Sequence, residues 1–157
     1  MSQPPPVPAG PPAIVPHLVV RGAAEAIEFY IKAFGAVEVA RMTMPDGQGV
    51  MHAEIRIGSA RLFLCDETPV MERWVSPKSL NGTTIALNLW TDNADQVFAR
   101  AVKAGARVVL PLADMFWGDR YGRLTDPFGH EWAIAQHVRD VSAQEMARSA
   151  KATPPAP

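Results

Sequence analysis

A histidine and a carboxylate, His52 and Glu54, are separated by a single residue in a run that alternates polar and apolar side chains up to Ile57. In a β-strand this alternation places His52, Glu54 and Arg56 on one face. A histidine beside a carboxylate is held in one tautomer with its charged form stabilised, which suits acid and base catalysis. With His17 from an earlier run, the pair could also hold a divalent metal. The alternative is that His52 and Glu54 form a cross-strand pair or an orienting hydrogen bond without a catalytic role.

Other side chains could contact a bound ligand. Asn88 falls on an inward strand face, where an amide needs a hydrogen-bonding partner, and is the preferred ligand contact. Trp90 and Trp117 could stack on a planar ligand or pack in the core or a dimer interface. Arg120 could clamp an anionic group, although an ion pair that holds the stretch Pro111 to Thr125 is the favoured interpretation. The full set of expected ligand contacts is His17, Arg56, Phe63, Asn88, Trp90, Trp117, Arg120 and Tyr121.

The elements that must position these residues occur in a weak internal repeat. Apolar spacing predicts helices at Ala23 to Phe34 and, about seventy positions later, at Ala94 to Ala104, each followed by Gly-Ala. A last short helix is expected from Ser142 to Lys151. The expected strands are Ile14 to Val20, Val37 to Met42, His52 to Ile57, Arg61 to Cys65, Ile85 to Thr91, Arg107 to Leu110, Tyr121 to Thr125 and Glu131 to Ala135.

The order of elements is therefore βαβββ, written twice. Two copies cannot stack into a solenoid, and pairing them into one curved mixed sheet gives an α+β fold. In the first strand Ile14, Leu18 and Val20 are expected to face the helices, with His17 on the opposite face. A long irregular stretch is expected from Pro111 to the strand at Tyr121.

Composition limits the classes of function. Proline concentrates at the ends, which predicts disordered tails at residues 1–12 and after a short helix in 139–157, around one domain at 13–138 with modules at about 13–68 and 82–137. A net charge of -1 predicts no nucleic-acid or membrane partner. The sequence has no spanning segment or signal peptide, so we expect a cytoplasmic protein. Its lone cysteine, Cys65, lies in an apolar run and is interpreted as a buried structural thiol.

Several motifs together resemble the vicinal-oxygen-chelate superfamily of glyoxalases, bleomycin-resistance proteins and dioxygenases. They are Ala26 to Tyr30, Ala33 to Ala36 and His52 to Gly58. Phe116 to Gly122 and Asp126 to His130 are similar to the PhnB-like branch. The resemblance covers about residues 14 to 141 and implies the glyoxalase/bleomycin resistance fold and a homodimer.

Catalytic members of this superfamily carry a divalent metal on four strand positions supplied by His and Glu. The resemblance aligns these positions with Val15, Ala86, Ala133 and either Phe63 or Cys65. None is an expected ligand, apart from the thiol if Cys65 is the aligned residue. No cofactor is therefore expected, and a divalent metal on His17, His52 and Glu54 is the alternative.

Three functions are compatible with the sequence. The first is a metal-free protein that sequesters an apolar or aromatic small molecule, favoured by the lost ligands and the aromatic residues. The second is a lyase, isomerase or dioxygenase that uses a metal or acid and base chemistry at His17, His52 and Glu54. The third is a regulatory domain with a vestigial cavity. Fold resemblance alone does not separate them.

Overall fold

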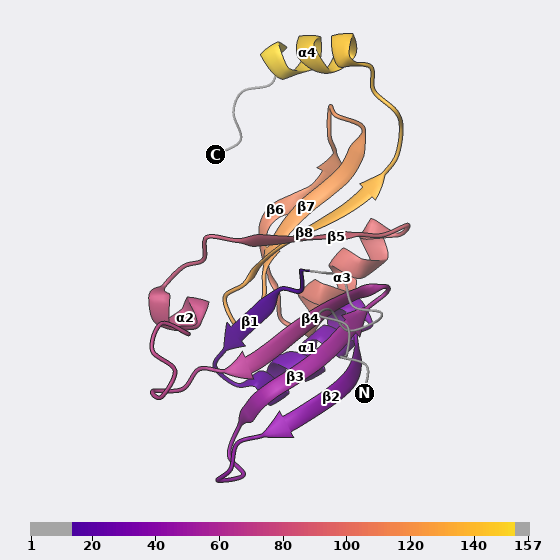
Figure 1. Ribbon diagram of the computed structural model, residues 1–157. Helices are drawn as coiled ribbons and strands as arrows, with labels where there is room; N and C mark the ends of the chain where they lie inside the picture. Colours follow the sequence, from indigo (N-terminus) through magenta and orange to yellow (C-terminus); the bar gives the residue numbers. More distant parts are fainter. Residues whose placement is uncertain (1–13, 153–157) are drawn as a thin grey trace, which may run out of the picture. The chain divides into compact units, whose positions relative to one another are not determined.

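The computed structural model describes residues 14–152, and the proline-rich ends predicted as tails, residues 1–12 and 153–157, lie outside them. The chain divides into two compact units, the first ending at Gly82 and the second beginning at Thr83. Each unit contains a four-stranded mixed sheet with a helix on one face (Figure 1). The predicted α+β class with two βαβββ modules is confirmed.

The first unit has its strands in the order β1-β4-β3-β2. β1 runs parallel to β4, and the other neighbouring strands are antiparallel. Because β1 pairs with β4, residues more than forty positions apart in the sequence lie side by side on the same face of the sheet. Its elements are β1 (His17–Val20), α1 (Ala23–Phe34), β2 (Val37–Thr43), β3 (Val50–Ile57), β4 (Ala60–Asp66) and α2 (Pro77–Leu80).

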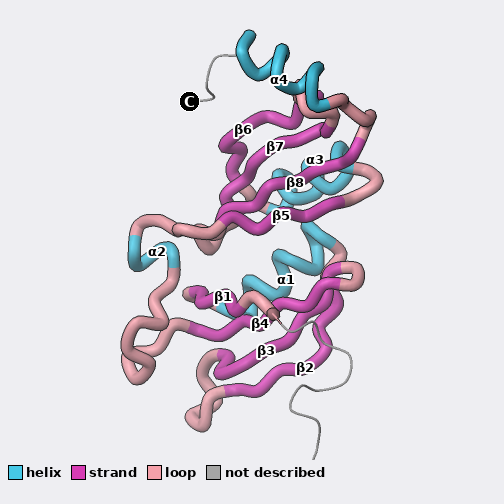
Figure 2. The backbone as a smooth tube through the Cα atoms, turned by 45° about the horizontal axis from the view of Figure 1, so that its top comes forward, coloured by secondary structure: helices cyan, strands magenta, loops and turns pink. Residues whose placement is uncertain are grey.

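Helix α1 covers one face of this sheet, as Figure 2 shows. Its apolar stripe includes Ile27 and Tyr30, whose side chains are completely buried. The helix ends at Gly35, which adopts a left-handed conformation that suits glycine and donates its N–H to the Ile31 carbonyl. The strand residues buried on the same face are Leu18, Val20, Ala53, Ile55, Ile57, Leu62 and Leu64.

The second unit repeats this arrangement with the strand order β5-β8-β7-β6. β5 runs parallel to β8, and the other pairs are antiparallel. Helix α3 packs on one face, where Leu124, Trp132 and Ile134 are buried. The elements are β5 (Ala86–Trp90), α3 (Ala94–Ala104), β6 (Arg107–Asp114), β7 (Asp119–Thr125), β8 (Glu131–His137) and α4 (Ala143–Ala152).

The predicted helices α1 and α3 are confirmed at both ends, and the expected N-cap of α4 is confirmed as well. Ser142 Oγ accepts the backbone N–H of Glu145 at 3.2 Å. Helix α2 was not predicted from the sequence, although it has a cap and a first-turn proline: Ser76 accepts the Ser79 N–H, and Pro77 follows it. Its four residues are too few for a periodic apolar pattern.

Many predicted strand ends differ from the structure by one or two residues, and the largest differences are at the start of β1 and around Pro111. The first strand begins at His17, and Ile14 is 84% exposed and not packed against the helix, because Pro16 has no N–H for a ladder and contributes only its carbonyl, to Phe63. The stretch after Pro111 is also not irregular: β6 continues to Asp114 and β7 begins at Asp119. Because β6 is an edge strand with a register shift between Leu110 and Ala113, it tolerates the proline.

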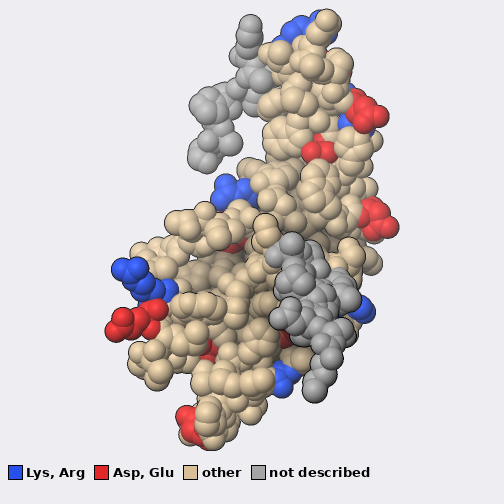
Figure 3. Space-filling view, viewed as in Figure 1, with Lys and Arg blue, Asp and Glu red and all other residues tan. Residues whose placement is uncertain are grey.

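Charged side chains on the face shown in Figure 3 are interspersed among other residues, with basic and acidic groups both present. The whole chain carries a formal net charge of -1. None of the helices within residues 14–152 combines the length and the apolar character needed to cross a bilayer.

Candidate functional site

The strand register of the first unit aligns candidate residues in a row across its helix-free face. Phe63 on β4 pairs with His17 on β1 and with Glu54 on β3. Side chains of directly paired residues lie on the same face of a sheet. The predicted grouping of His17, Glu54 and Phe63 therefore corresponds to neighbouring positions on three adjacent strands.

Aromatic rings form a cluster around His17. Its ring centroid lies 4.6 Å from that of Trp74, 5.5 Å from that of His52 and 5.8 Å from that of Phe63, each in an edge-to-face arrangement. His52 and Phe63 also contact each other, with centroids 4.9 Å apart. Edge-to-face geometry is favourable because the positive edge of one ring meets the negative face of another. We call these four residues, His17, His52, Phe63 and Trp74, the His17 cluster.

One atom in the His17 cluster lacks a partner. The Nε2 atom of His17 is buried and makes no hydrogen bond within the described part of the chain. Burial, and secondarily the nearby His52, lower the pKa of His17 below its ordinary value. His17 is therefore neutral at pH 7, with a ring nitrogen available to a ligand or a water molecule. A buried polar atom left without a partner costs about 1–3 kcal/mol, so such a partner would be stabilising.

Glu54 is engaged with an arginine instead of a histidine. Its Oε1 accepts a hydrogen bond from Arg61 Nη1 at 2.8 Å, and Glu54 is the better buried member of the pair. Arg56, which pairs with Arg61 in the strand register, is exposed. One expectation was a hydrogen bond between Glu54 and His52; in the structure Glu54 forms an ion pair with Arg61.

The predicted trio of His17, His52 and Glu54 is not arranged as a metal site. Among the residues that the structure describes, no group of three or more His, Cys, Asp or Glu side chains has ligand geometry. At the aligned family positions, Ala86 and Ala133 lie on neighbouring strands of the second sheet and offer no donor atom. Within residues 14–152, His17, His52 and Glu54 therefore do not form a three-ligand group for a divalent metal.

The thiol of Cys65 does not supply the missing donor. Cys65 is 1% exposed, which confirms the expected buried thiol. Burial, with a contribution from the neighbouring Asp66, raises the pKa of Cys65 above its ordinary value. The free thiol is therefore protonated at neutral pH, whereas nucleophilic attack needs the thiolate.

The helix-free face of the second sheet carries the other predicted contacts. Ala86, Asn88 and Trp90 alternate along β5 on this face; all three are exposed, Trp90 by 60%. Trp90 pairs with Ala135 on β8, which in turn pairs with Tyr121 on β7. An amide and an indole thus stand next to each other on β5, and we call Asn88 and Trp90 the β5 pair.

Trp117 and Tyr121 form a separate aromatic contact in the β6–β7 hairpin. Their ring centroids are 5.7 Å apart, and the ring of Phe116 lies 5.0 Å from that of Trp117. All three side chains are partly exposed. The predicted ligand contacts Trp117 and Tyr121 therefore pack against each other. Tyr121 and Trp90 both pair with Ala135 on β8, so they lie on the same face of the sheet.

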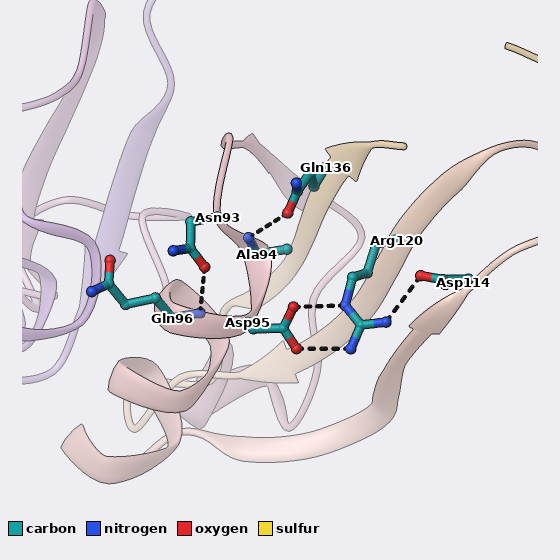
Figure 4. Close-up of polar contacts among 7 residues, drawn as sticks. All are labelled: Asn93, Ala94, Asp95, Gln96, Asp114, Arg120 and Gln136. Atoms are coloured by element: carbon teal, nitrogen blue, oxygen red, sulfur yellow. Dashed lines mark hydrogen bonds and ion pairs between the residues drawn. The ribbon is translucent and has the colours of Figure 1, made fainter. Parts of the chain in front are cut away.

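Arg120 contacts helix α3, as Figure 4 shows. Its guanidinium donates two hydrogen bonds to Asp95 on α3, at 2.7 and 2.8 Å, and one to Asp114 on β6, at 2.9 Å. Alternation along β7 places Arg120 opposite to the face of Tyr121. The favoured expectation of an ion pair is thus met, with partners the sequence did not identify, and Arg120 is occupied.

Figure 4 also shows how the start of α3 is fixed near this ion pair. Asn93 accepts the Gln96 N–H, and Gln136 at the end of β8 accepts the Ala94 N–H at 3.0 Å. In the first unit Asp66 has the corresponding role at α1, seventy positions earlier in the sequence. Each helix start is therefore tied to the strand parallel to the one that leads into it.

Sequence reasoning missed Trp74, a central member of the His17 cluster. It lies between β4 and α2, in a segment with no strand or helix periodicity. Arg61, the partner of Glu54, was predicted to lie in a strand but not to form an ion pair. Its position opposite Arg56 follows from the β3–β4 register, which the Gly58-Ser59 turn sets.

Comparison with known proteins shows what the chain is similar to. Residues 13–134 match the model of the Glyoxalase/Bleomycin resistance protein/Dioxygenase superfamily. An uncharacterized protein from Mycobacterium bovis is 47% identical over 137 residues, which is 86% of this chain and 90% of that protein.

Solved structures are similar as well. The structure of a gene product from Arabidopsis thaliana has a TM-score of 0.65 at 29% identity, covering 79% of this chain and 98% of that one. A PhnB protein from Bacillus cereus has a TM-score of 0.60 at 19% identity, covering 80% and 99%. The second likeness concerns the fold alone.

Proposed function

The chain belongs to the Glyoxalase/Bleomycin resistance protein/Dioxygenase superfamily, and we propose that it binds an apolar or aromatic small molecule without using a metal. The β5 pair carries this proposal. Ala86 occupies the aligned metal position on β5, while Asn88 and Trp90 beside it are exposed. An indole face and an amide are suited to a planar ligand with one or a few polar groups.

The His17 cluster supports the same proposal from the first unit. It presents aromatic rings around one imidazole nitrogen that has no partner among the described residues. Binding sites for small molecules combine mostly apolar walls with a few polar groups that fix orientation. The helix-free face of the second sheet likewise combines aromatic and polar side chains, among them Trp90, Asn88 and the Arg123–Glu131 ion pair.

The test is a thermal-shift and fluorescence screen of planar aromatic compounds with the wild type, Trp90→Leu and Asn88→Ala. We expect at least one compound to stabilise the wild type and quench its tryptophan fluorescence. Loss of the stacking partner in Trp90→Leu should weaken binding by up to about tenfold. Val102→Ala, on the exposed side of α3, is the control and should bind normally. Equal binding by Trp90→Leu would show that the β5 pair is not the site.

A metal-free enzyme is the second candidate, and the neutral His17 favours it. A neutral imidazole with a free nitrogen can accept a proton from a bound carbon or oxygen acid. Compounds from the screen that have an acidic C–H group would be incubated in D₂O and followed by NMR for exchange of that carbon-bound proton, because protons on oxygen exchange without a catalyst. Exchange that disappears in His17→Gln while binding remains would establish this role, and exchange unchanged in that variant would exclude it.

We also propose a homodimer, as is frequent in this superfamily. The edge strand β2 supports it, because Val37, Val39 and Met42 are 52–54% exposed there. An exposed apolar edge strand is open to pairing unless something covers it. Light scattering during size exclusion should give twice the 17.0 kDa of one chain, and a monomer at micromolar concentration would contradict the proposal.

A further inference from the structure

A pocket of about 920 Å³ lies within the first unit, apart from the His17 cluster. Its walls come from the β1–α1 turn, the β2–β3 hairpin and the segment after β4. Figure 1 shows these three connections at the same end of the unit, where β1 and β4 finish. The volume is within the range typical of small-molecule sites. We call it the hairpin pocket.

One carboxylate fastens the three walls of the hairpin pocket to each other. Asp66 at the end of β4 accepts the N–H groups of Gly22 and Ala23 at 2.9 and 2.8 Å, and that of Val50 at 2.7 Å. Gly49 passes so close that an added Cβ would lie 3.1 Å from Asp66 Oδ2. The start of α1 thus already has an internal anion, so the helix dipole is not available to an external one.

Methionine side chains supply much of the apolar surface of the hairpin pocket. Met44 and Met51 come from the hairpin and Met71 from the segment after β4. Met51 is 39% and Met71 40% exposed. Flexible thioether side chains adapt to differently shaped apolar ligands and are frequent on surfaces that bind more than one partner.

The charges around the hairpin pocket favour a cation. Four carboxylates line it against the one guanidinium of Arg21. Hydrogen bonds from Ser76 and Ser79 hold the pKa of Glu67 below its ordinary value, so this group is ionised at neutral pH. Glu25 is exposed in the first turn of α1. The carboxylates are those of Glu25, Asp46, Asp66 and Glu67.

We propose that the hairpin pocket binds an organic cation with an apolar body, whose hydrocarbon part contacts the methionines and whose nitrogen lies near the acidic rim. The proposal is independent of the β5 pair, because every residue that lines the pocket belongs to the first unit. It adds a second class of ligand to the function proposed above.

The test uses three probes with the same apolar body, a phenyl ring on four methylenes: 4-phenylbutylamine, 4-phenylbutanol and 5-phenylpentanoate. Each is titrated into ¹⁵N-labelled full-length protein and followed by NMR. We expect the amine to bind most tightly, the alcohol more weakly and the carboxylate least, with shifts concentrated in residues 44–51 and 66–71. Added salt should weaken only the amine, since screening acts on the charge.

Variants separate charge from shape. Glu25→Gln should weaken the amine about two- to fivefold and leave the alcohol unchanged, as expected for one exposed charge pair. Met71→Ala should weaken both. Glu28→Gln is the matched control on the same helix, because Glu28 pairs with Lys32 and does not line the pocket. Trp90→Leu and His17→Gln should bind the amine normally.

Three outcomes would overturn the proposal. They are equal or tighter binding of 5-phenylpentanoate, amine-induced shifts located outside the two segments, and no binding of any probe at millimolar concentration. Loss of amine binding in Trp90→Leu would assign the cation to the β5 pair instead. Folding of each variant is checked by its melting temperature, and a variant that fails to fold is replaced by Asp46→Asn at the exposed hairpin tip.

Discussion

His17 combines tight packing with an unpartnered polar atom in one side chain. It contacts three aromatic or imidazole rings, yet one of its nitrogens has no partner among the described residues. Unpartnered buried groups are uncommon in folded proteins and are expected where function needs them. Substitution of His17 is therefore expected to affect both ligand binding and the stability of the first unit.

The lowered pKa of His17 predicts the direction of a pH effect. The folded protein binds this proton more weakly than the unfolded chain, whose histidine pKa is about 6.5. The free energy of unfolding should therefore fall as pH drops below 6.5 toward the folded-state pKa. His17→Gln should lose less stability than the wild type between pH 7 and pH 5 in urea unfolding. Equal losses would show that His17 is not buried as described.

His137 gives the opposite sign and is the internal comparison. Hydrogen bonds to Asp119 and Asp140 raise the pKa of His137 above its ordinary value. Its stabilising contribution is complete below pH 6.5 and is lost as pH rises through the folded-state pKa. When the same urea unfolding is extended to pH values above 7, the difference in free energy of unfolding between the wild type and His137→Gln should shrink as pH rises.

At the scale of elements, two glycines of the Phe116 to Gly122 motif have steric roles. A Cβ on Gly118 would lie 2.1 Å from the Arg139 carbonyl oxygen, and Gly118 has a φ of 100°. A Cβ on Gly122 would lie 2.7 Å from Phe98 on α3 and 2.9 Å from the backbone of Leu112 on β6. These close approaches explain why the motif contains glycine at both positions.

Gly122→Ala should therefore destabilise the protein by about 1–3 kcal/mol, because the Leu112 backbone cannot move aside easily. Urea unfolding measures the change. Gly82→Ala is the matched control: its new Cβ meets no atom within 4 Å, so its stability should change by less than about 1 kcal/mol. A Gly122→Ala protein as stable as the control would mean that α3 and β6 are not packed so closely.

Helices α1 and α3 were predictable because each combines an apolar stripe with a glycine at its end, which are local signals. β6 and β7 were predicted too short, because Pro111 suggested a break that an edge strand does not require. Arg120 was expected to lie outside a strand. The alternation along β7, which places its side chain on the helix side of the sheet, was therefore not applied to it. His17, Glu54 and Phe63 followed from alternation, whereas the contact of Trp74 depends on a segment without any repeat.

At the scale of the whole molecule, each of the two modules has a helix-free sheet face, and within residues 14–152 no three His, Cys, Asp or Glu side chains come together as a metal site would need. Alanines occupy two of the positions that the resemblance aligns with metal ligands, and their neighbours on the same sheet include Asn88 and the Arg123–Glu131 ion pair. Polar groups of this kind bind through hydrogen bonds, and aromatic rings such as that of Trp90 through stacking. The central claim is therefore that recognition in this protein does not require a metal.

Elemental analysis tests that claim most directly. Purified wild type and a His52→Ala/Glu54→Ala variant are exposed to zinc, manganese, nickel and iron, passed through a desalting column and analysed for bound metal. We predict well under one equivalent of each metal in both proteins. One equivalent in the wild type that is absent from the variant would contradict the account and identify a metal centre at His52 and Glu54.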